Sequence, residues 1–218
     1  MPSTGFKFPT GNVTGIVTPY DDVDWTSPGN VYADDGSYAN ITPASFDSPK
    51  YSYVLRAWTF DFSSIPDGST IDGIEVKIEG HYADGTVDLV YLRLCGYDTG
   101  YINYGDNRSE LPDSFATSDT VWTYGSSTDK WGATLTSDIV KATYFGVQLA
   151  VQATAANADI FIDYVSMNVY YTESTGTTYN DTITLAKNNA LTDSNLADLA
   201  NSITLSKVAA LTDGNNMV

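Results

Sequence analysis

The stretch IEVKI, residues 74–78, decides the fold. Ile74, Val76 and Ile78 alternate with two charged side chains, so one face of the stretch is apolar and the other is polar. Strict alternation is typical of a strand that buries one face, because successive side chains of a strand point to opposite sides. The stretch therefore predicts a β-strand whose isoleucine face packs on a core.

Four further stretches predict strands. FGVQLAVQA (145–153) and IFIDYVSMNVYY (160–171) alternate in the same way. The apolar register of the second stretch changes near Asp163, and a β-bulge there would reconcile its two halves. YVLRAWTFDF (53–62) and VDLVYLRLC (87–95) are apolar on both faces. This pattern favours a sheet that packs on one side and is covered on the other.

Short turns rich in Gly and Asp separate these stretches, and no helix of ten or more residues is expected before residue 185. Many short strands joined by such turns are typical of an all-β fold. The sequence predicts an antiparallel, jelly-roll-like β-sandwich over residues 25–172, preceded by an N-terminal arm over 1–24. A polar linker and a small strand and helix-turn segment are expected over 173–218.

The charge balance limits the partners of this chain. It has 27 acidic and 10 basic residues among 218, which gives a formal net charge of −17. Such a charge repels polyanions, so we expect neither nucleic acid nor an anionic membrane surface as a partner. The sequence has no run of about 18 apolar residues, so no membrane span is expected. The N-terminus has no apolar signal-peptide core, which favours assembly in a cytoplasm.

The sequence offers little for catalysis. His81 is the only histidine, so a Ser-His-Asp or Cys-His arrangement would depend on it alone, and a site with several His ligands is excluded. Cys95 is the only cysteine, and its place in a predicted strand favours a buried, inert thiol. We expect a protein that is not an enzyme and needs no cofactor. A hydrolase built on a pair of Asp carboxylates is the alternative.

Two Asp-rich turns are candidates for calcium, because carboxylate oxygens are hard ligands. They contain Asp22 and Asp24 in YDDVDW, and Asp34 and Asp35 in ADDG. Neither turn has the spacing of an EF-hand loop, and Asp side chains in turns commonly cap their own backbone. We therefore expect no metal and keep calcium as the alternative.

Two stretches rich in aromatic and small polar residues, GYDTGYINYGDN (96–107) and VWTYGSSTDKWG (121–132), suggest a binding surface. Aromatic rings beside polar groups hold sugars or flat partners. The alternative is that the rings close the ends of the sandwich or a subunit interface. The candidate platform residues are Tyr101, Tyr104, Trp122, Tyr124 and Trp131.

The C-terminal segment repeats itself, because ITLAKNNALTD (183–193) returns as ITLSKVAALTD (203–213). A unit of this length cannot bury its own apolar face, and about three stacked units are normally needed. Two copies on one chain fall short, so we expect a homotrimer or a docked neighbour to complete them. The expected contact residues are Ile183, Leu185, Leu191, Leu196, Leu199, Ile203, Leu205 and Leu211.

Three motifs occur in a characteristic order: FDFSSIPDGSTIDGIEVKIEG (60–80), FGVQL (145–149) and IDYVSMNVYY (162–171). In this order they resemble a β-sandwich domain of tailed-bacteriophage virion proteins. The C-terminal repeats are similar to those at the ends of some phage structural proteins. The resemblance implies a non-enzymatic role in the virion, next to the major capsid protein or to tail and fibre proteins. It carries over no catalytic residues.

Two functions follow from these observations. The main expectation is a virion structural protein, a capsid decoration or head-fibre component that its terminal segments hold on the particle. The alternative is a receptor- or carbohydrate-binding module of a tail fibre or tail-associated protein, with the aromatic stretches as its platform.

Overall fold

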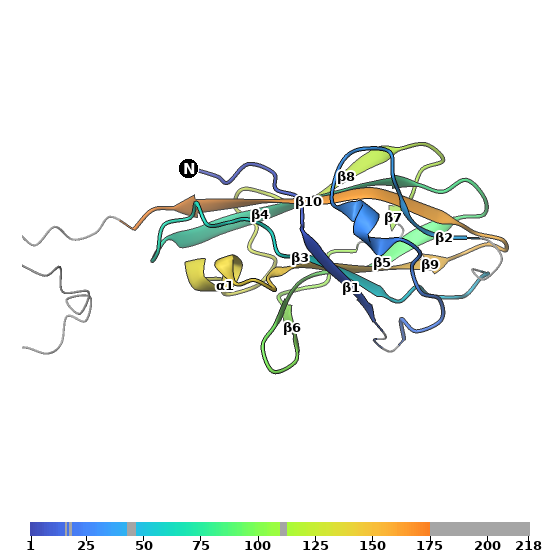
Figure 1. Ribbon diagram of the computed structural model, residues 1–218, viewed down its shortest axis with the longest axis horizontal. Helices are drawn as coiled ribbons and strands as arrows, with labels where there is room; N and C mark the ends of the chain where they lie inside the picture. Colours follow the sequence, from blue (N-terminus) through green and yellow to red (C-terminus); the bar gives the residue numbers. More distant parts are fainter. Residues whose placement is uncertain (16, 18, 43–46, 110–112, 175–218) are drawn as a thin grey trace, which may run out of the picture. The chain divides into compact units, whose positions relative to one another are not determined.

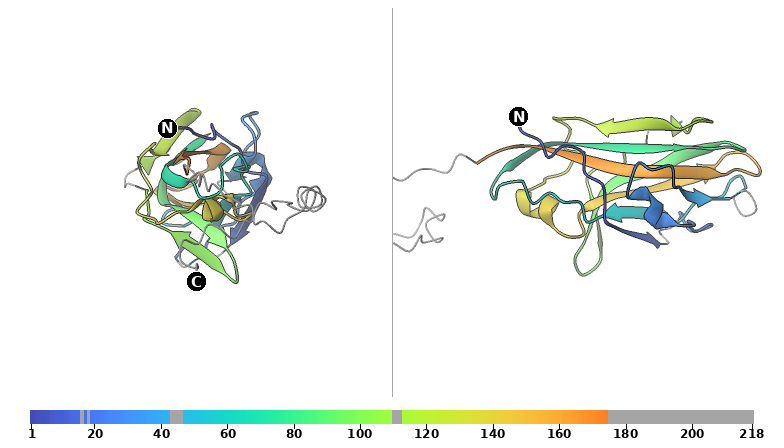
Figure 2. Two further views of the ribbon diagram at one scale, coloured as in Figure 1. Left: turned by 90° about the vertical axis from the view of Figure 1, so that its left-hand side faces the viewer. Right: turned by 45° about the horizontal axis from the view of Figure 1, so that its top comes forward.

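The computed structural model describes residues 1–15, 17, 19–42, 47–109 and 113–174, and these residues form two antiparallel β-sheets packed face to face (Figures 1 and 2). The predicted all-β sandwich is therefore confirmed. The strands are β1 (Gly11–Gly15), β2 (Ala39–Ile41), β3 (Val54–Trp58), β4 (Thr70–His81), β5 (Val87–Tyr97), β6 (Tyr101–Tyr104), β7 (Asp113–Ser114), β8 (Thr120–Gly125), β9 (Gly146–Ala153) and β10 (Ile160–Thr172). Two short helices join them, the 3₁₀ turn η1 (Pro28–Val31) and α1 (Ser137–Lys141).

The two sheets differ in size. The six-stranded sheet has the order β1-β3-β9-β5-β6, with β7 also paired to β5. The four-stranded sheet has the order β2-β10-β4-β8. Non-consecutive strands pair throughout, so the chain crosses between the sheets repeatedly, as it does in a jelly roll.

The core forms where the two inner faces meet, and the predicted alternation produces it. Ile74, Val76 and Ile78 on β4 are fully buried, as the IEVKI pattern predicts. On β10 the pairing with β4 shifts register between Ile162 and Tyr164. The bulge expected near Asp163 is therefore confirmed.

The N-terminal residues differ from the expected arm. Residues 11–15 form β1, which pairs with β3 at the edge of the six-stranded sheet. Nearer the N-terminus, Lys7 and Met167 exchange two backbone hydrogen bonds of 2.9 Å along the edge of β10. The sequence did not predict these pairings, because a stretch rich in Gly and Thr shows no clear alternation of apolar and polar residues.

The repeats of residues 181–216, with their expected contact residues, lie outside the described residues. Within the described part of the chain, no helix has the length and apolar character needed to cross a bilayer.

Candidate functional site

Four aromatic side chains gather on the outer face of the six-stranded sheet and, with Val13, line a hollow of about 240 Å³. Trp58 ends β3, Tyr97 ends β5, Tyr101 begins β6 and Tyr144 precedes β9. The three tyrosines are 45%, 52% and 45% exposed. Large aromatic side chains are seldom left this exposed in a group, so this aromatic cluster is the strongest candidate for a binding surface.

The four rings contact one another in a closed circuit. Trp58 stacks on Tyr101 with ring centroids 6.2 Å apart and planes 17° from parallel. Tyr144 meets the edges of Trp58 and Tyr97 at 5.2 and 5.7 Å, and Tyr97 meets Tyr101 at 5.3 Å. These contacts arrange the rings around the hollow without burying them, so their faces are available to a ligand.

Two glycines make room for Trp58. A Cβ at Gly11 would lie 2.9 Å from the indole Cδ1, and a Cβ at Gly146 would lie 2.1 Å from the carbonyl oxygen of Ala57 and 2.9 Å from the Cβ of Trp58. These distances are shorter than real Cβ contacts, so any other residue would displace the indole or the strand. Thr59, the next residue, has a φ of 61°, a conformation that β-branched residues rarely adopt. Such strain is concentrated at functional sites.

A polar row lies beside the aromatic cluster on the same face. Arg56 on β3 is paired in register with Gln148 on β9, which is paired with Arg93 on β5. The Gln148 amide donates to Asn103 Oδ1 at 2.5 Å and to the hydroxyl of Tyr91 at 3.2 Å. Both Arg56 and Gln148 are 1% exposed, so this row is a buried polar layer next to exposed aromatic rings.

Arg56 belongs to the polar row and also contacts the aromatic cluster. Its guanidinium carbon lies 3.9 Å from the centroid of the Tyr101 ring, and its Nε and Nη1 have no hydrogen-bond partner. Cys95, on β5 and so two strands away from Arg56, is fully buried. Burial raises the pKa of its thiol to about 12, although the positive charge of Arg56 acts in the opposite direction. The predicted burial of this thiol is confirmed.

The structure separates the residues predicted as a platform. Tyr101 belongs to the aromatic cluster, but Tyr104 points inward and contacts Phe145 of the core. Trp122 and Tyr124 lie on β8, at the edge of the other sheet.

Trp131 is 0% exposed and offers no face to a ligand. Its assignment to a platform is corrected, because its indole N–H is hydrogen-bonded inside the core. Trp58, Tyr144 and Arg56 were missed, because the topology alone brings these distant residues together.

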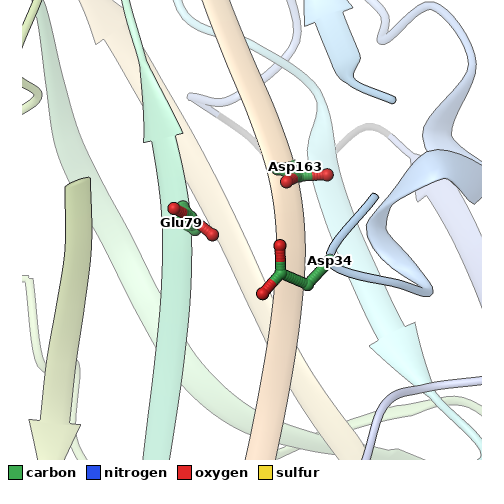
Figure 3. Close-up of side chains that lie close together, drawn as sticks. All are labelled: Asp34, Glu79 and Asp163. Carbon is green, nitrogen blue, oxygen red and sulfur yellow. The ribbon is translucent and has the colours of Figure 1, made fainter. Parts of the chain in front are cut away.

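Three carboxylates meet on the four-stranded sheet, and Figure 3 shows how they lie. Asp34 reaches from the loop after η1 toward Glu79 on β4 and Asp163 on β10, with their oxygens within 4.8 Å of one another. Burial, and then the neighbouring acids, raise the pKa of Glu79. Burial also raises the pKa of Asp163, although the N–H groups of Gly36 and Asp35 donate to it. Such a set could hold a hard cation or share a proton.

The other calcium candidates accept hydrogen bonds from backbone N–H groups. Asp22 accepts from the N–H of Tyr51 at 2.7 Å, and Asp24 accepts from Trp25 at 2.8 Å. Asp35 accepts from Ser37 at 2.9 Å, which is an Asx turn. Of the four candidates, Asp34 is the one that the structure brings to other acids. Its partners are Glu79 and Asp163.

His81 lies on β4, and its Nδ1 is 2.7 Å from Asp119 Oδ1. The hydroxyl of Tyr38 donates to the other oxygen of Asp119 at 2.9 Å. Burial raises the pKa of Asp119, but the hydrogen bonds from His81 and Tyr38 outweigh it and hold this pKa below its usual value. The hydrogen bond to Asp119 raises the pKa of Tyr38 to about 12. These contacts tie the loop before β8 to the sheet.

Comparison with known proteins adds a set of solved structures. No protein-family model matches the sequence, and no curated protein matches it at a significant level. Among the similar structures is a family 29 carbohydrate-binding module from Piromyces equi, with 17% identity and a TM-score of 0.34 over 77% of this chain and 91% of that chain. Another is a mutant family 29 module in complex with mannohexaose, with 12% identity and a TM-score of 0.33 over 79% and 94% of the two chains. Because these values are low, the function of this chain rests on its own residues.

Proposed function

We propose that this chain is a non-catalytic module that binds carbohydrate on the aromatic cluster of the six-stranded sheet. The observation that carries the proposal is the closed circuit of four exposed or half-buried rings around a hollow of about 240 Å³. Sugar rings present apolar C–H faces and polar edges, so they stack on aromatic rings while their hydroxyls bond to polar groups nearby. Asn103, an exposed residue of β6 whose Oδ1 accepts from the Gln148 amide, supplies such a group.

The surroundings of the cluster support binding without turnover. A glycosidase needs two carboxyl groups on either side of the scissile bond. The three clustered acids, Asp34, Glu79 and Asp163, lie on the four-stranded sheet, whereas the rings belong to the six-stranded sheet. The aromatic cluster and the acidic cluster are therefore not the two halves of one hydrolytic site.

A place on a phage particle stays a prediction. A module that holds a surface glycan is compatible with a tail-fibre or tail-associated protein, the alternative that the sequence motifs imply. The head-decoration role and the homotrimer depend on residues 181–216, which lie outside the described residues. The carbohydrate proposal stands independently of them.

A glycan array with the full chain tests the proposal, followed by calorimetric titration of the strongest ligand. We expect Trp58→Ala and Tyr101→Ala each to weaken binding by about tenfold or more, because central aromatic contacts dominate interface energies. Trp122→Ala is the matched control, since it removes a half-buried tryptophan from the other sheet. Absence of binding to any glycan, or loss of binding in the control alone, would reject the proposed site.

A further inference from the structure

Arg56 is a buried cation without an anion. The residue is 1% exposed, and its Nε and Nη1 have no hydrogen-bond partner. Among the residues that the structure describes, no carboxylate forms an ion pair with it. Buried charges in proteins are normally paired, because an isolated one loses its hydration without compensation. The face of Tyr101 offsets only part of that loss.

A second arginine repeats the pattern on the same row. Arg93 follows Arg56 across the sheet through Gln148, and its Nε is also buried without a partner. The row continues to Val13 on β1, so it contains two cations and no acid. Arg108 also has a buried Nε without a partner, but it differs in that its guanidinium pairs with Asp129 at 2.6 Å. This row of the six-stranded sheet thus has a local excess of positive charge on a strongly acidic chain.

We infer that the aromatic cluster and Arg56 form one site for an acidic saccharide, a sugar unit that carries a carboxylate. This inference rests on the proposed carbohydrate-binding function and names its ligand class. The sugar ring lies on the aromatic cluster, and the carboxylate accepts hydrogen bonds from the guanidinium of Arg56. A planar fork of N–H donors matches a carboxylate in shape and charge, and such bonds are stronger than neutral ones.

Tyr101 covers the cation in the free protein. Its ring lies over the guanidinium, but the residue is 52% exposed. Tyr101 is the first residue of β6, in the β5–β6 hairpin that projects from the sandwich (Figure 1). The acidic-saccharide site requires this one side chain to rotate off the guanidinium and uncover Arg56. Tyr101 therefore stacks on the sugar and gates the cation below it.

The net charge of −17 favours a short acidic ligand over a long one at this site. A long polyanion is repelled by the whole chain, as is expected for such a charge. A short saccharide is governed by nearby groups, because salt at physiological strength screens charges beyond about 8 Å. Asp98, in the exposed turn of the β5–β6 hairpin, is an acid directly after Tyr97 of the aromatic cluster. Short uronate oligosaccharides are thus the expected ligands.

The test compares matched ligands on the full chain. Short oligosaccharides of galacturonate, glucuronate and mannuronate are titrated next to their neutral methyl esters, at low salt and at about 0.15 M salt. We expect at least one acid to bind about tenfold more tightly than its own ester, the effect of one charge-assisted bond. Added salt should reduce this preference. Arg56→Gln should abolish this preference, so that the acid and its ester bind the variant equally.

Arg108→Gln is the control, because it removes an arginine that already has a carboxylate partner. If Arg56→Gln does not fold, Tyr101→Ala replaces it, and this variant should lose affinity for acid and ester alike while keeping the preference for the acid. Equal binding of every acid and its ester, or tighter binding of the esters, would overturn the inference and leave the carbohydrate proposal standing. Absence of binding to any saccharide, neutral or acidic, would remove both.

Discussion

The indole N–H of Trp131 donates a hydrogen bond of 3.0 Å to the carbonyl oxygen of Ile74, inside the core. Ile74 is the first residue of the stretch that decides the fold, and Trp131 comes from a loop rich in Ser and Thr. The bond fastens this loop to β4. The neighbours of Trp131 have the composition of a binding loop, but Trp131 itself is part of the folded core.

Removal of this bond should destabilise the protein without affecting saccharide binding. Trp131→Phe leaves a buried carbonyl unsatisfied and should lower the free energy of unfolding by about 1–3 kcal/mol. Trp131→Ala also leaves a cavity and should cost about 3–5 kcal/mol. Urea unfolding measures both. Unchanged stability of the Phe variant would contradict the role of the bond.

The acidic cluster should make stability depend on pH. Because the pKa values of Glu79 and Asp163 are raised, the folded protein holds their protons more tightly than the unfolded chain does. Their contribution to stability is thus present at low pH and is lost as pH rises through the raised pKa values. Asp34→Asn removes a neighbouring charge, so it should raise the melting temperature at neutral pH, and this gain should vanish in acid.

The matched control for the acidic cluster is Glu173→Gln, which removes one exposed negative charge elsewhere. Its melting temperature should follow that of the wild type over the same pH range. Loss of wild-type stability on addition of a chelator would contradict the prediction, because it would mean that a cation neutralises the cluster.

The glycine beside Trp58 should control the shape of the aromatic cluster. Gly11→Ala places a methyl group 2.9 Å from the indole Cδ1, so the indole must move. We expect saccharide affinity to fall several-fold, because a small displacement of a positioning group is costly. Gly100→Ala is the control, since a Cβ there meets nothing within 4 Å. Equal affinities of the two variants would show that the position of the indole does not matter.

The buried thiol should be inert in the folded protein. The pKa of Cys95 is raised to about 12, so almost no thiolate is present near neutral pH. Iodoacetamide should leave the native chain unmodified and label it fully in denaturant, as mass spectrometry would report. Rapid labelling of the native chain would mean that this part of β5 opens frequently.

The sequence predicts the fold well where one face of a strand is buried. The alternation of Ile74, Val76 and Ile78 sets the inner face of β4, and the broken phase at Asp163 locates the bulge of β10. Both signals are local, since each is contained in a single strand. Pairing between distant strands leaves no such signal, and this is why β1 was not expected.

The site was harder to predict, because its residues meet only after folding. Tyr101 was found from its Gly- and Asn-rich surroundings, whereas Trp58 and Arg56 occur in a strand that is apolar on both faces. That pattern correctly indicated a covered outer face, but it could not show that a cation would lie under an exposed ring. Composition also favoured Trp131, since burial of a loop aromatic depends on contacts far away in the chain.

The pairing of Lys7 with Met167 joins the first residues of the chain to its last described strand. During synthesis the N-terminal residues leave the ribosome first, and their partner strand is among the last parts of this domain to emerge. The four-stranded sheet therefore cannot complete its edge until translation of the sandwich is over, and contacts of such high sequence separation slow folding. An extension fused at the N-terminus would be attached to the segment that closes the fold.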